Sequence, residues 1–246
     1  MPLAVRGTDG PLRPFLLVHD LGADSRVWAD VAERLYAAGH QVAAVDLRGH
    51  GLSDAPATGY DTDTCADDLS TLLDALGFTG GRSPVVVGHG WGANVAMSLA
   101  ARRDGLAAVC CLDGGWIRPA WQYGSFEECW AAWSTGDQAD PADPAGDAGE
   151  QRRRSIVRSL FYGEPRAWFP LVAVPVVLCP LVPPDGRPDP HGRGTATRTG
   201  VAEAVSRLPK ARVSWYYGEG SALAADPSKL VDDLLVLAAD AEPQID

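Results

Sequence analysis

The sequence predicts an α/β protein with a mostly parallel, doubly wound sheet. Short apolar runs, such as residues 15–18 and 42–45, alternate with segments of helical periodicity, which is typical of parallel strands joined by covering helices. The chain has 246 residues, of which 46% are hydrophobic, and a single α/β domain with a sizeable core routinely has this size. A third apolar run, residues 85–87, leads through a glycine-rich turn into a helical segment.

Capping residues and glycines set the bounds of the elements in the first half of the chain. Asp24 and Ser25 can cap the first helix, and Gly39 ends it. In chain order we expect strands over residues 15–18, 42–45, 85–87 and 107–112, and helices between Asp24 and Gly39, over residues 63–76 and from Trp91 through Ala100.

The alternation breaks after residue 113. Residues 116–168 are rich in aromatic side chains and then low in complexity, and residues 136–149 consist mostly of Asp, Ala, Pro and Gly, which predicts a flexible loop. Beyond it we expect a basic helix over residues 150–160, a strand over 174–178, a proline- and glycine-rich loop over 180–194, a helix over 201–208, a last strand over 212–217 and a closing helix over 227–237.

Charge and cysteine content exclude several classes of partner. A net charge of −11 repels nucleic acid and anionic membrane surfaces, so we expect neither as a partner. Five cysteines with no C-x-x-C pair argue against a disulfide framework or a zinc site and favour reduced thiols in the core. The first residues lack the apolar region of a signal peptide, and no apolar run approaches the roughly 20 residues that span a bilayer. These features predict a cytoplasmic protein without a metal site.

The most informative segment is the turn after the third strand. Residues 85–92, VVVGHGWG, follow the strand–turn–helix pattern G-x-S-x-G, in which the middle serine is a nucleophile. The middle residue here is Gly90, and glycine has no side chain that can attack a substrate. Glycine suits the strained backbone of such a turn, and the missing side chain also leaves room for a ligand. Both interpretations stay open.

Three segments together resemble the α/β-hydrolase superfamily: His19-Asp20-Leu21-Gly22, the loop of residues 46–54 (DLRGHGLSD) and the turn of residues 88–92. The resemblance implies a sheet of the α/β-hydrolase type, with a core of residues 1–114 and 171–246 and a short helical cap over residues 115–170. Members of the superfamily are mostly esterases, lipases, epoxide hydrolases, dehalogenases and carbon–carbon bond hydrolases, which use no metal or organic cofactor.

The resemblance also places the functional positions of the superfamily on this chain. The nucleophile position falls on Gly90. The histidine of the superfamily commonly lies in a Gly-x-Gly-His-like run after the last strand, and the matching run here, residues 218–221, ends in Ser221. The acid position falls on Asp185 or, as in some members, on Asp113. The resemblance therefore implies a pseudo-hydrolase that lacks the nucleophile and the base of the catalytic triad.

The oxyanion turn departs from the family pattern as well, because His19-Asp20 stands where His-Gly is usual. A carboxylate at this position repels a developing oxyanion and therefore opposes acyl transfer. Asp20 can instead serve as a general acid or base in a poorly solvated pocket, or it is a solvated or capping aspartate. The backbone N–H groups of Leu21 and Trp91 can form an anion-binding pocket at the start of the helix.

Two further acids complete the set of candidate catalytic residues with Asp20. Asp113 ends a strand that faces the crevice, and Glu219 borders the position of the family histidine. The alternative role of Asp113 is a helix or loop cap, and Glu219 can instead be a side chain that faces solvent. In this fold histidines beside the turn are more often packed supports than catalysts. The ligand-binding candidates lie beside the turn, in the cap or at the vacated histidine position: His19, Leu21, His89, Gly90, Trp91, Trp116 and Ser221.

These residues favour an enzyme with reassigned chemistry. Dehydration, cyclisation, isomerisation and conjugate addition need positioning and acid–base catalysis but no covalent intermediate. We therefore expect a cofactor-independent lyase, cyclase or isomerase of biosynthesis that acts on a largely apolar small metabolite. One alternative is a non-catalytic protein that binds a small molecule on a hydrolase scaffold. The other is a hydrolase that uses a noncanonical site, with water activated by Asp113 or Asp20.

Overall fold

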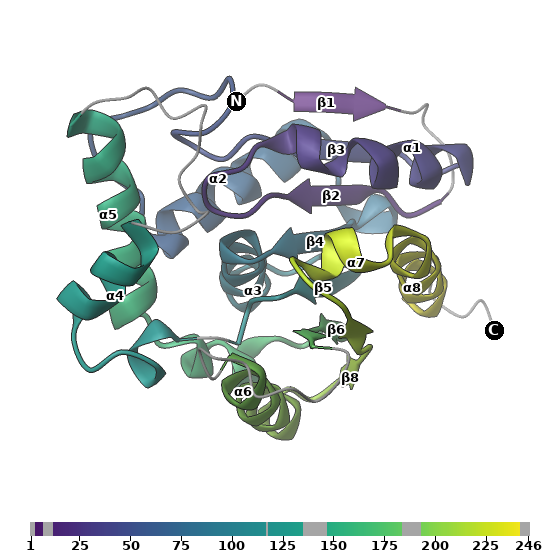
Figure 1. The fold of residues 1–246 in the computed structure, drawn as a ribbon. Helices are drawn as coiled ribbons and strands as arrows, with labels where there is room; N and C mark the ends of the chain where they lie inside the picture. Colours follow the sequence, from purple (N-terminus) through teal and green to yellow (C-terminus); the bar gives the residue numbers. More distant parts are fainter. Residues whose placement is uncertain (1–2, 7–11, 117, 135–146, 184–192, 242–246) are drawn as a thin grey trace.

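The structure, a computed structural model, describes residues 3–6, 12–116, 118–134, 147–183 and 193–241. These residues form a 7-stranded sheet of order β1-β3-β2-β4-β5-β6-β8, with helices on both faces (Figure 1). The strand β1 runs antiparallel to β3, and the other neighbours are parallel, which confirms the predicted fold class. The strands are β1 (Leu3–Arg6), β2 (Phe15–Val18), β3 (Val42–Val45), β4 (Val85–His89), β5 (Ala108–Leu112), β6 (Val176–Cys179) and β8 (Ala211–Val213).

The helices that follow these strands along the chain cover both faces of the sheet (Figure 1). The α-helices are α1 (Ala29–Ala37), α2 (Thr62–Ala75), α3 (Trp91–Arg102), α4 (Phe126–Ser134), α5 (Asp147–Tyr162), α6 (Arg193–Arg207), α7 (Ala222–Ala225) and α8 (Pro227–Asp240). Short 3-10 helices are η1 (Ser25–Trp28), η2 (Gly80–Arg82), η3 (Pro119–Trp121), η4 (Pro165–Ala167) and η5 (Phe169–Leu171).

The sheet separates two hydrophobic cores. In β2, Leu16 and Val18 belong to the core under α2 and α3, whereas Phe15 and Leu17 belong to the core under α1 and α8. Adjacent residues of a strand point to opposite faces, so a strand that is apolar at every position must be covered on both sides. This explains why the strands read as continuous apolar runs in the sequence.

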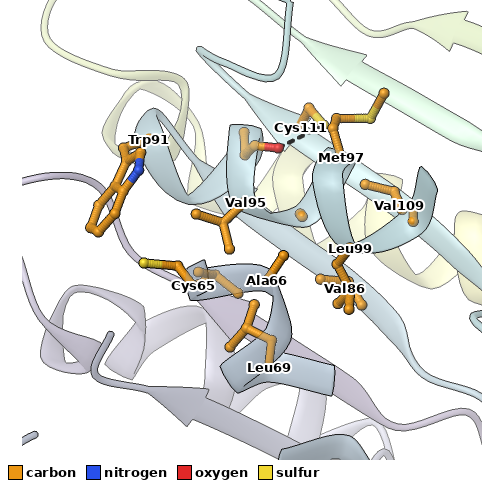
Figure 2. Packing of buried hydrophobic residues seen from close by; sticks show 14 of the residues in the cluster. Cys65, Ala66, Leu69, Val86, Trp91, Val95, Met97, Leu99, Val109 and Cys111 are labelled. Carbon is orange, nitrogen blue, oxygen red and sulfur yellow. Dashed lines mark hydrogen bonds between the residues drawn. The ribbon is translucent and has the colours of Figure 1, made fainter. Parts of the chain in front are cut away.

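The helix α3 is buried from Trp91 through Ala100, because it lies between the sheet and α2 (Figure 2). Its first turn approaches the sheet very closely. A Cβ atom on Gly92 would lie 2.4 Å from the carbonyl oxygen of His19, and one on Gly88 would lie 2.3 Å from the carbonyl oxygen of Gly92. Only glycine fits these contacts, and they fix the turn between β4 and α3 against the end of β2.

The prediction of one strand over residues 212–217 is wrong. The segment is divided into β8, which pairs with β6, and β9 (Tyr216–Tyr217), which pairs with β7 (Leu181–Val182) in a separate 2-stranded sheet. Pro180 lies between β6 and β7 and has no N–H group for the ladder. Its carbonyl still accepts a hydrogen bond from the Tyr216 N–H at 3.0 Å. The chain passes from one sheet to the other at this residue without a turn.

Other elements differ from the predictions mainly in their bounds. The edge strand β1 was not predicted. The helix predicted from Asp24 begins as η1, with Asp24 as its N-cap, and continues as α1. The helices α5 and α6 both begin earlier than residues 150 and 201, and the predicted loop of residues 180–194 contains β7. Most of the loop predicted over residues 136–149 lies outside the described residues.

Residues 115–170, for which we expect a cap, connect β5 to β6 and carry η3, α4, α5 and η4. The helix α5 packs against the core through the buried side chains of Ile156, Val157 and Leu160, and polar groups add to this contact. The Ser159 hydroxyl accepts a hydrogen bond from the Thr62 N–H at 3.2 Å, and the Arg152 guanidinium donates to the carbonyl of Gly49. No helix in the described part of the chain is both long and apolar enough to cross a bilayer.

Candidate functional site

Gly90 lies between β4 and α3 at the carboxyl edge of the sheet. Its backbone has φ 51° and ψ −115°, a conformation that residues with a Cβ rarely adopt. The Gly90 N–H donates to the carbonyl of Leu112 at 2.8 Å, so the turn is attached to the neighbouring strand β5. A Cβ on Gly114 would lie 2.1 Å from the Gly90 carbonyl oxygen. The turn is therefore enclosed by glycines that allow two loops to meet at the sheet edge.

The carboxylate of Asp20 occupies the pair of N–H groups that we expected to bind an external anion. Its Oδ1 atom accepts hydrogen bonds from the backbone N–H of Leu21 at 2.7 Å and of Trp91 at 2.6 Å. The second donor lies at the N-terminus of α3, where the helix dipole favours negative charge. Asp20 thus supplies an internal anion to this pocket from the loop after β2.

The same carboxylate also occupies the space where a side chain at position 90 would lie. A Cβ atom built on Gly90 would lie 2.1 Å from both Cγ and Oδ1 of Asp20, and 2.3 Å from Oδ2. Atoms that are not bonded do not approach so closely. Any residue other than glycine at position 90 must therefore displace the Asp20 side chain, so residues 20 and 90 form one steric unit.

Asp113 follows β5 in a left-handed backbone conformation with φ 52°. Its Oδ1 accepts from the N–H of Leu181 at 2.7 Å, and its Oδ2 accepts from the N–H of Ala222 at 2.6 Å. The Nε2 atom of His89 lies 3.8 Å from the same Oδ2. The structure thus brings together two predicted site residues, His89 and Asp113, and ties Asp113 to the start of α7.

Opposing influences act on the pKa of the Asp113 carboxyl. Burial raises the pKa of the Asp113 carboxyl, and the negative charge of Asp20 acts in the same direction. The two backbone N–H donors and His89 act against this shift and favour the carboxylate. Two neighbouring acids with different surroundings are a common arrangement for acid–base chemistry.

His19 is a fully buried support of the oxyanion turn. Its Nδ1 atom lies 2.7 Å from the carbonyl oxygen of Asp20, and its Nε2 accepts from the N–H of Leu47 at 3.0 Å. Because the carbonyl can only accept, the ring carries its proton on Nδ1. Burial lowers the pKa of His19 to about 4. His19 therefore stays neutral near pH 7 and fixes the backbone that carries Asp20.

Among the described residues, none of the remaining candidates forms a hydrogen bond with Asp20. Glu219 is exposed to solvent, and Ser221 caps α7 by accepting from the N–H of Ala224 at 3.3 Å. Trp116, which we expected to line a ligand pocket, is fully buried in the core under α3. Asp185 lies outside the described residues.

The sequence analysis predicted a basic helix over residues 150–160 but missed a contact region that its arginines form. Arg152 lies over the ring of Tyr60, with 6.0 Å from its Cζ to the ring centroid. A shallow pocket beside the oxyanion turn is lined by Leu21, Gly22, Gly49, His50, Arg152, Arg153 and Ile156. No sequence signal marks this contact, because it joins segments about a hundred residues apart. Within the described residues no group of His, Cys, Asp and Glu could hold a metal ion.

Comparison with known proteins defines the class. The sequence profile of the family described as alpha/beta hydrolase fold matches residues 13–159, which is more than half of the chain. The chain therefore belongs to the α/β-hydrolase fold family, whose members are overwhelmingly enzymes.

Individual relatives cover smaller parts of the chain. It is 39% identical over 105 residues to 2-(acetamidomethylene)succinate hydrolase of Mesorhizobium japonicum, covering 42% of this chain and 36% of that protein. It is 38% identical over 107 residues to the soluble epoxide hydrolase of a Corynebacterium species, covering 43% and 36%. The chain thus aligns with about a third of the length of these relatives. The solved structure of MenH from S. aureus covers 98% of this chain and 99% of its own, with a TM-score of 0.76 and 13% identity, a likeness of fold.

Proposed function

We propose that this protein is a cofactor-independent enzyme of the α/β-hydrolase fold that performs acid–base chemistry, and not acyl transfer, on a small, largely apolar metabolite. Gly90 and Ser221 take the places of the nucleophile and the base histidine in this proposal. The reactions that fit are dehydration, cyclisation, isomerisation and conjugate addition. All of them need a proton removed from one atom and returned to another.

One observation supports the proposal most strongly: the two N–H groups that would stabilise an oxyanion are already bound to Asp20 Oδ1. Acyl transfer needs these donors free for the charge that develops on the substrate. With the carboxylate in place, a substrate carbonyl finds a negative charge where it needs donors. The same observation disfavours a hydrolase that uses activated water at this site.

The arrangement suits the removal of a proton by Asp20. The two N–H donors hold Oδ1, so the group keeps one orientation and Oδ2 is left to accept a proton. The pKa of Asp113 is raised mainly by burial, and this acid, with His89 at 3.8 Å, is the partner that returns the proton. We assign Asp20 as the base and the Asp113–His89 pair as the acid.

Deuterium uptake tests this assignment without a known substrate. Wild-type protein in D₂O is incubated with a panel of medium-chain ketones and β-hydroxy ketones, and proton NMR follows exchange at the carbon beside the carbonyl. We expect exchange above the buffer rate, and we expect Asp20→Asn to slow it by about 100-fold, which is a typical contribution of a general base. Asp104→Asn changes an exposed aspartate after the far end of α3 and serves as the matched control. Equal rates for wild type and Asp20→Asn would contradict the proposal.

A non-catalytic binding protein is the second candidate. It is favoured by the backbone hydrogen bonds of Asp20 and Asp113, because each carboxylate accepts two N–H groups as a purely structural cap does. Tryptophan fluorescence titration with the same ketone panel separates the two functions. Saturable binding with complete recovery of unexchanged ketone would favour the binding protein.

A further inference from the structure

The outer face of α5 carries a row of two arginines and one tyrosine. Arg154, Arg158 and Tyr162 follow one another at intervals of four residues, so they lie in one line along the helix, over about 12 Å of its length. The helix packs on the core through other positions, among them Ile156 and Leu160. Figure 1 shows α4 and α5 next to each other at one edge of the molecule, where a second protein molecule can reach this row.

Aromatic rings hold both arginines in place. The Cζ atom of Arg154 lies 5.4 Å from the ring centroid of Phe126 in α4 and 5.6 Å from that of Trp130. The Cζ atom of Arg158 lies 5.5 Å from the ring centroid of Phe126 and 5.3 Å from that of Tyr162. A guanidinium that rests on aromatic rings is attracted by their electron-rich faces and keeps few orientations, while the N–H groups at its edge stay able to donate.

The two arginines differ in their charge partners. Arg154 donates through Nη2 to both carboxylate oxygens of Glu127, at 3.0 and 2.9 Å. Arg158 is exposed, and it forms no hydrogen bond or ion pair with any residue that the structure describes. Its guanidinium is thus a cation in a fixed place, whose N–H donors no carboxylate of the described chain accepts.

Glu127 gives the same face the opposite charge. Its side chain is 71% exposed, and each of its carboxylate oxygens can accept more than the bond from Arg154. Glu127, Arg154, Arg158 and Tyr162, which we call the α4–α5 face, therefore hold both partners of an ion pair without joining Glu127 to Arg158. A surface that carries both partners in this way is complementary to its own copy after a two-fold rotation.

We propose that the α4–α5 face joins two copies of this protein in a two-fold symmetric dimer. Arg158 of each protomer donates to Glu127 of its partner, so the ion pair forms twice. The ring of Tyr162, which is 56% exposed, becomes covered in the same contact. Arginine and tyrosine are the residue types that most often anchor protein interfaces. The inference does not depend on the proposed function, because none of these residues belongs to the site around Asp20.

The charges of the α4–α5 face favour a second copy over other partners. An acidic segment of another protein, or a nucleic acid, would bind Arg158 but would be repelled by Glu127 and by the net charge of −11. Two copies also repel each other through this net charge. At about 0.15 M salt, however, exposed charges more than about 8 Å apart are largely screened, whereas the ion pairs across the contact act at shorter range.

Exchange of the two charges tests the reciprocal contact. Sedimentation velocity over a concentration series at about 0.15 M salt measures the mass of each species, and we expect the wild type to dimerise. Arg158→Ala should raise the Kd of the dimer by at least about tenfold, as the loss of an anchoring interface arginine does. Arg158→Glu sets carboxylates against each other across the interface and Glu127→Lys sets cations against each other, so each variant alone should be monomeric. Mixed in equal amounts, the two variants should form a heterodimer, because both ion pairs are then restored.

Arg212→Ala is the matched control, because it removes an exposed arginine of β8 that pairs with Asp240, and it should dimerise like the wild type. Melting followed by circular dichroism shows whether each variant is folded. A wild type that stays monomeric throughout the series, or folded charge variants that form no heterodimer, would overturn the inference. If Glu127→Lys does not fold, Arg158→Gln takes its place. It removes the charge and keeps much of the length, so it should weaken the dimer as Arg158→Ala does, and an unchanged Kd would overturn the inference.

Discussion

Residues 20 and 90 form one steric unit at the carboxyl edge of the sheet. The carboxylate of Asp20 lies where a side chain at position 90 would be, and its Oδ1 binds the N–H of Trp91 next to that position. Neither residue is informative alone, since an aspartate in a loop is common and a glycine in a tight turn is expected. Their contact explains both the aspartate at position 20 and the glycine at position 90.

The steric coupling of these residues gives the first prediction. Gly90→Ala should destabilise the protein by about 2 kcal/mol, because alanine is strained at φ 51° and its Cβ meets the carboxylate. In an Asp20→Ala background the cost should be smaller by about 1 kcal/mol, since only the backbone strain remains. Urea unfolding of the four variants of this cycle measures the coupling. Strictly additive effects would show that the two positions are independent.

His19 gives the second prediction, a pH dependence of stability. Its pKa is lowered from 6.5 to about 4, chiefly by burial, so between these values the unfolded chain binds a proton that the folded protein excludes. The full stability is present above the pKa of this histidine in the unfolded chain. It is lost as the pH falls toward the pKa of His19 in the folded protein. We expect His19 to account for a loss of about 2 kcal/mol between pH 7 and pH 5. His19→Gln should flatten the stability curve over this interval, as measured by urea unfolding, and a curve parallel to the wild type would contradict the assignment.

At the scale of elements, Asp113 joins three parts of the chain. It follows β5, and its two oxygens hold the N–H of Leu181 in β7 and of Ala222 at the start of α7. Its backbone is left-handed, with φ 52°. The small sheet of β7 and β9 therefore depends on a side chain from the central sheet.

The third prediction follows from this junction. Asp113→Ala should lower the free energy of unfolding by about 3 kcal/mol, because it leaves two N–H donors without a charged acceptor and places alanine at positive φ. Asp113→Asn should lower the free energy of unfolding by a smaller amount, since asparagine tolerates this backbone conformation and keeps one acceptor oxygen. Amide hydrogen exchange should accelerate at Leu181 and Ala222 in both variants. Unchanged exchange at both amides would show that other contacts hold α7.

At the scale of the whole molecule, the two cores on either side of the sheet enclose all five cysteines. They are Cys65, Cys110, Cys111, Cys129 and Cys179. The sulfur atoms of Cys110 and Cys179 lie 3.6 Å apart without a disulfide bond. Burial raises the pKa of the Cys129 thiol to about 11. This agrees with the interpretation of the cysteines as reduced core thiols.

Thiol reactivity gives the fourth prediction. A thiolate is the reactive form, and access to it requires opening of the core. The native protein should therefore show no thiol that reacts rapidly with Ellman's reagent, and all five should react in guanidinium chloride. One fast thiol in the native protein would indicate that a core element opens readily.

The sequence by itself determined the strands β2 to β6 of the central sheet and most of the covering helices, because strands buried on both faces must be apolar at every position and helices must repeat their apolar residues about every fourth position. It also determined that position 90 carries no side chain. It did not place β1, β7 or β9, which are short elements without a pattern that distinguishes them from loops.

Only the tertiary structure decided what surrounds Gly90. The sequence indicated that Leu21 and Trp91 form an anion pocket and that Asp20 is unusual, but not that Asp20 fills the pocket itself. Residues 20 and 91 lie 71 positions apart, and their contact arises only when parallel β2 and β4 become neighbours in the sheet. Local patterns report the preferences of short segments, whereas a hydrogen bond between distant loops depends on the packing of the whole chain.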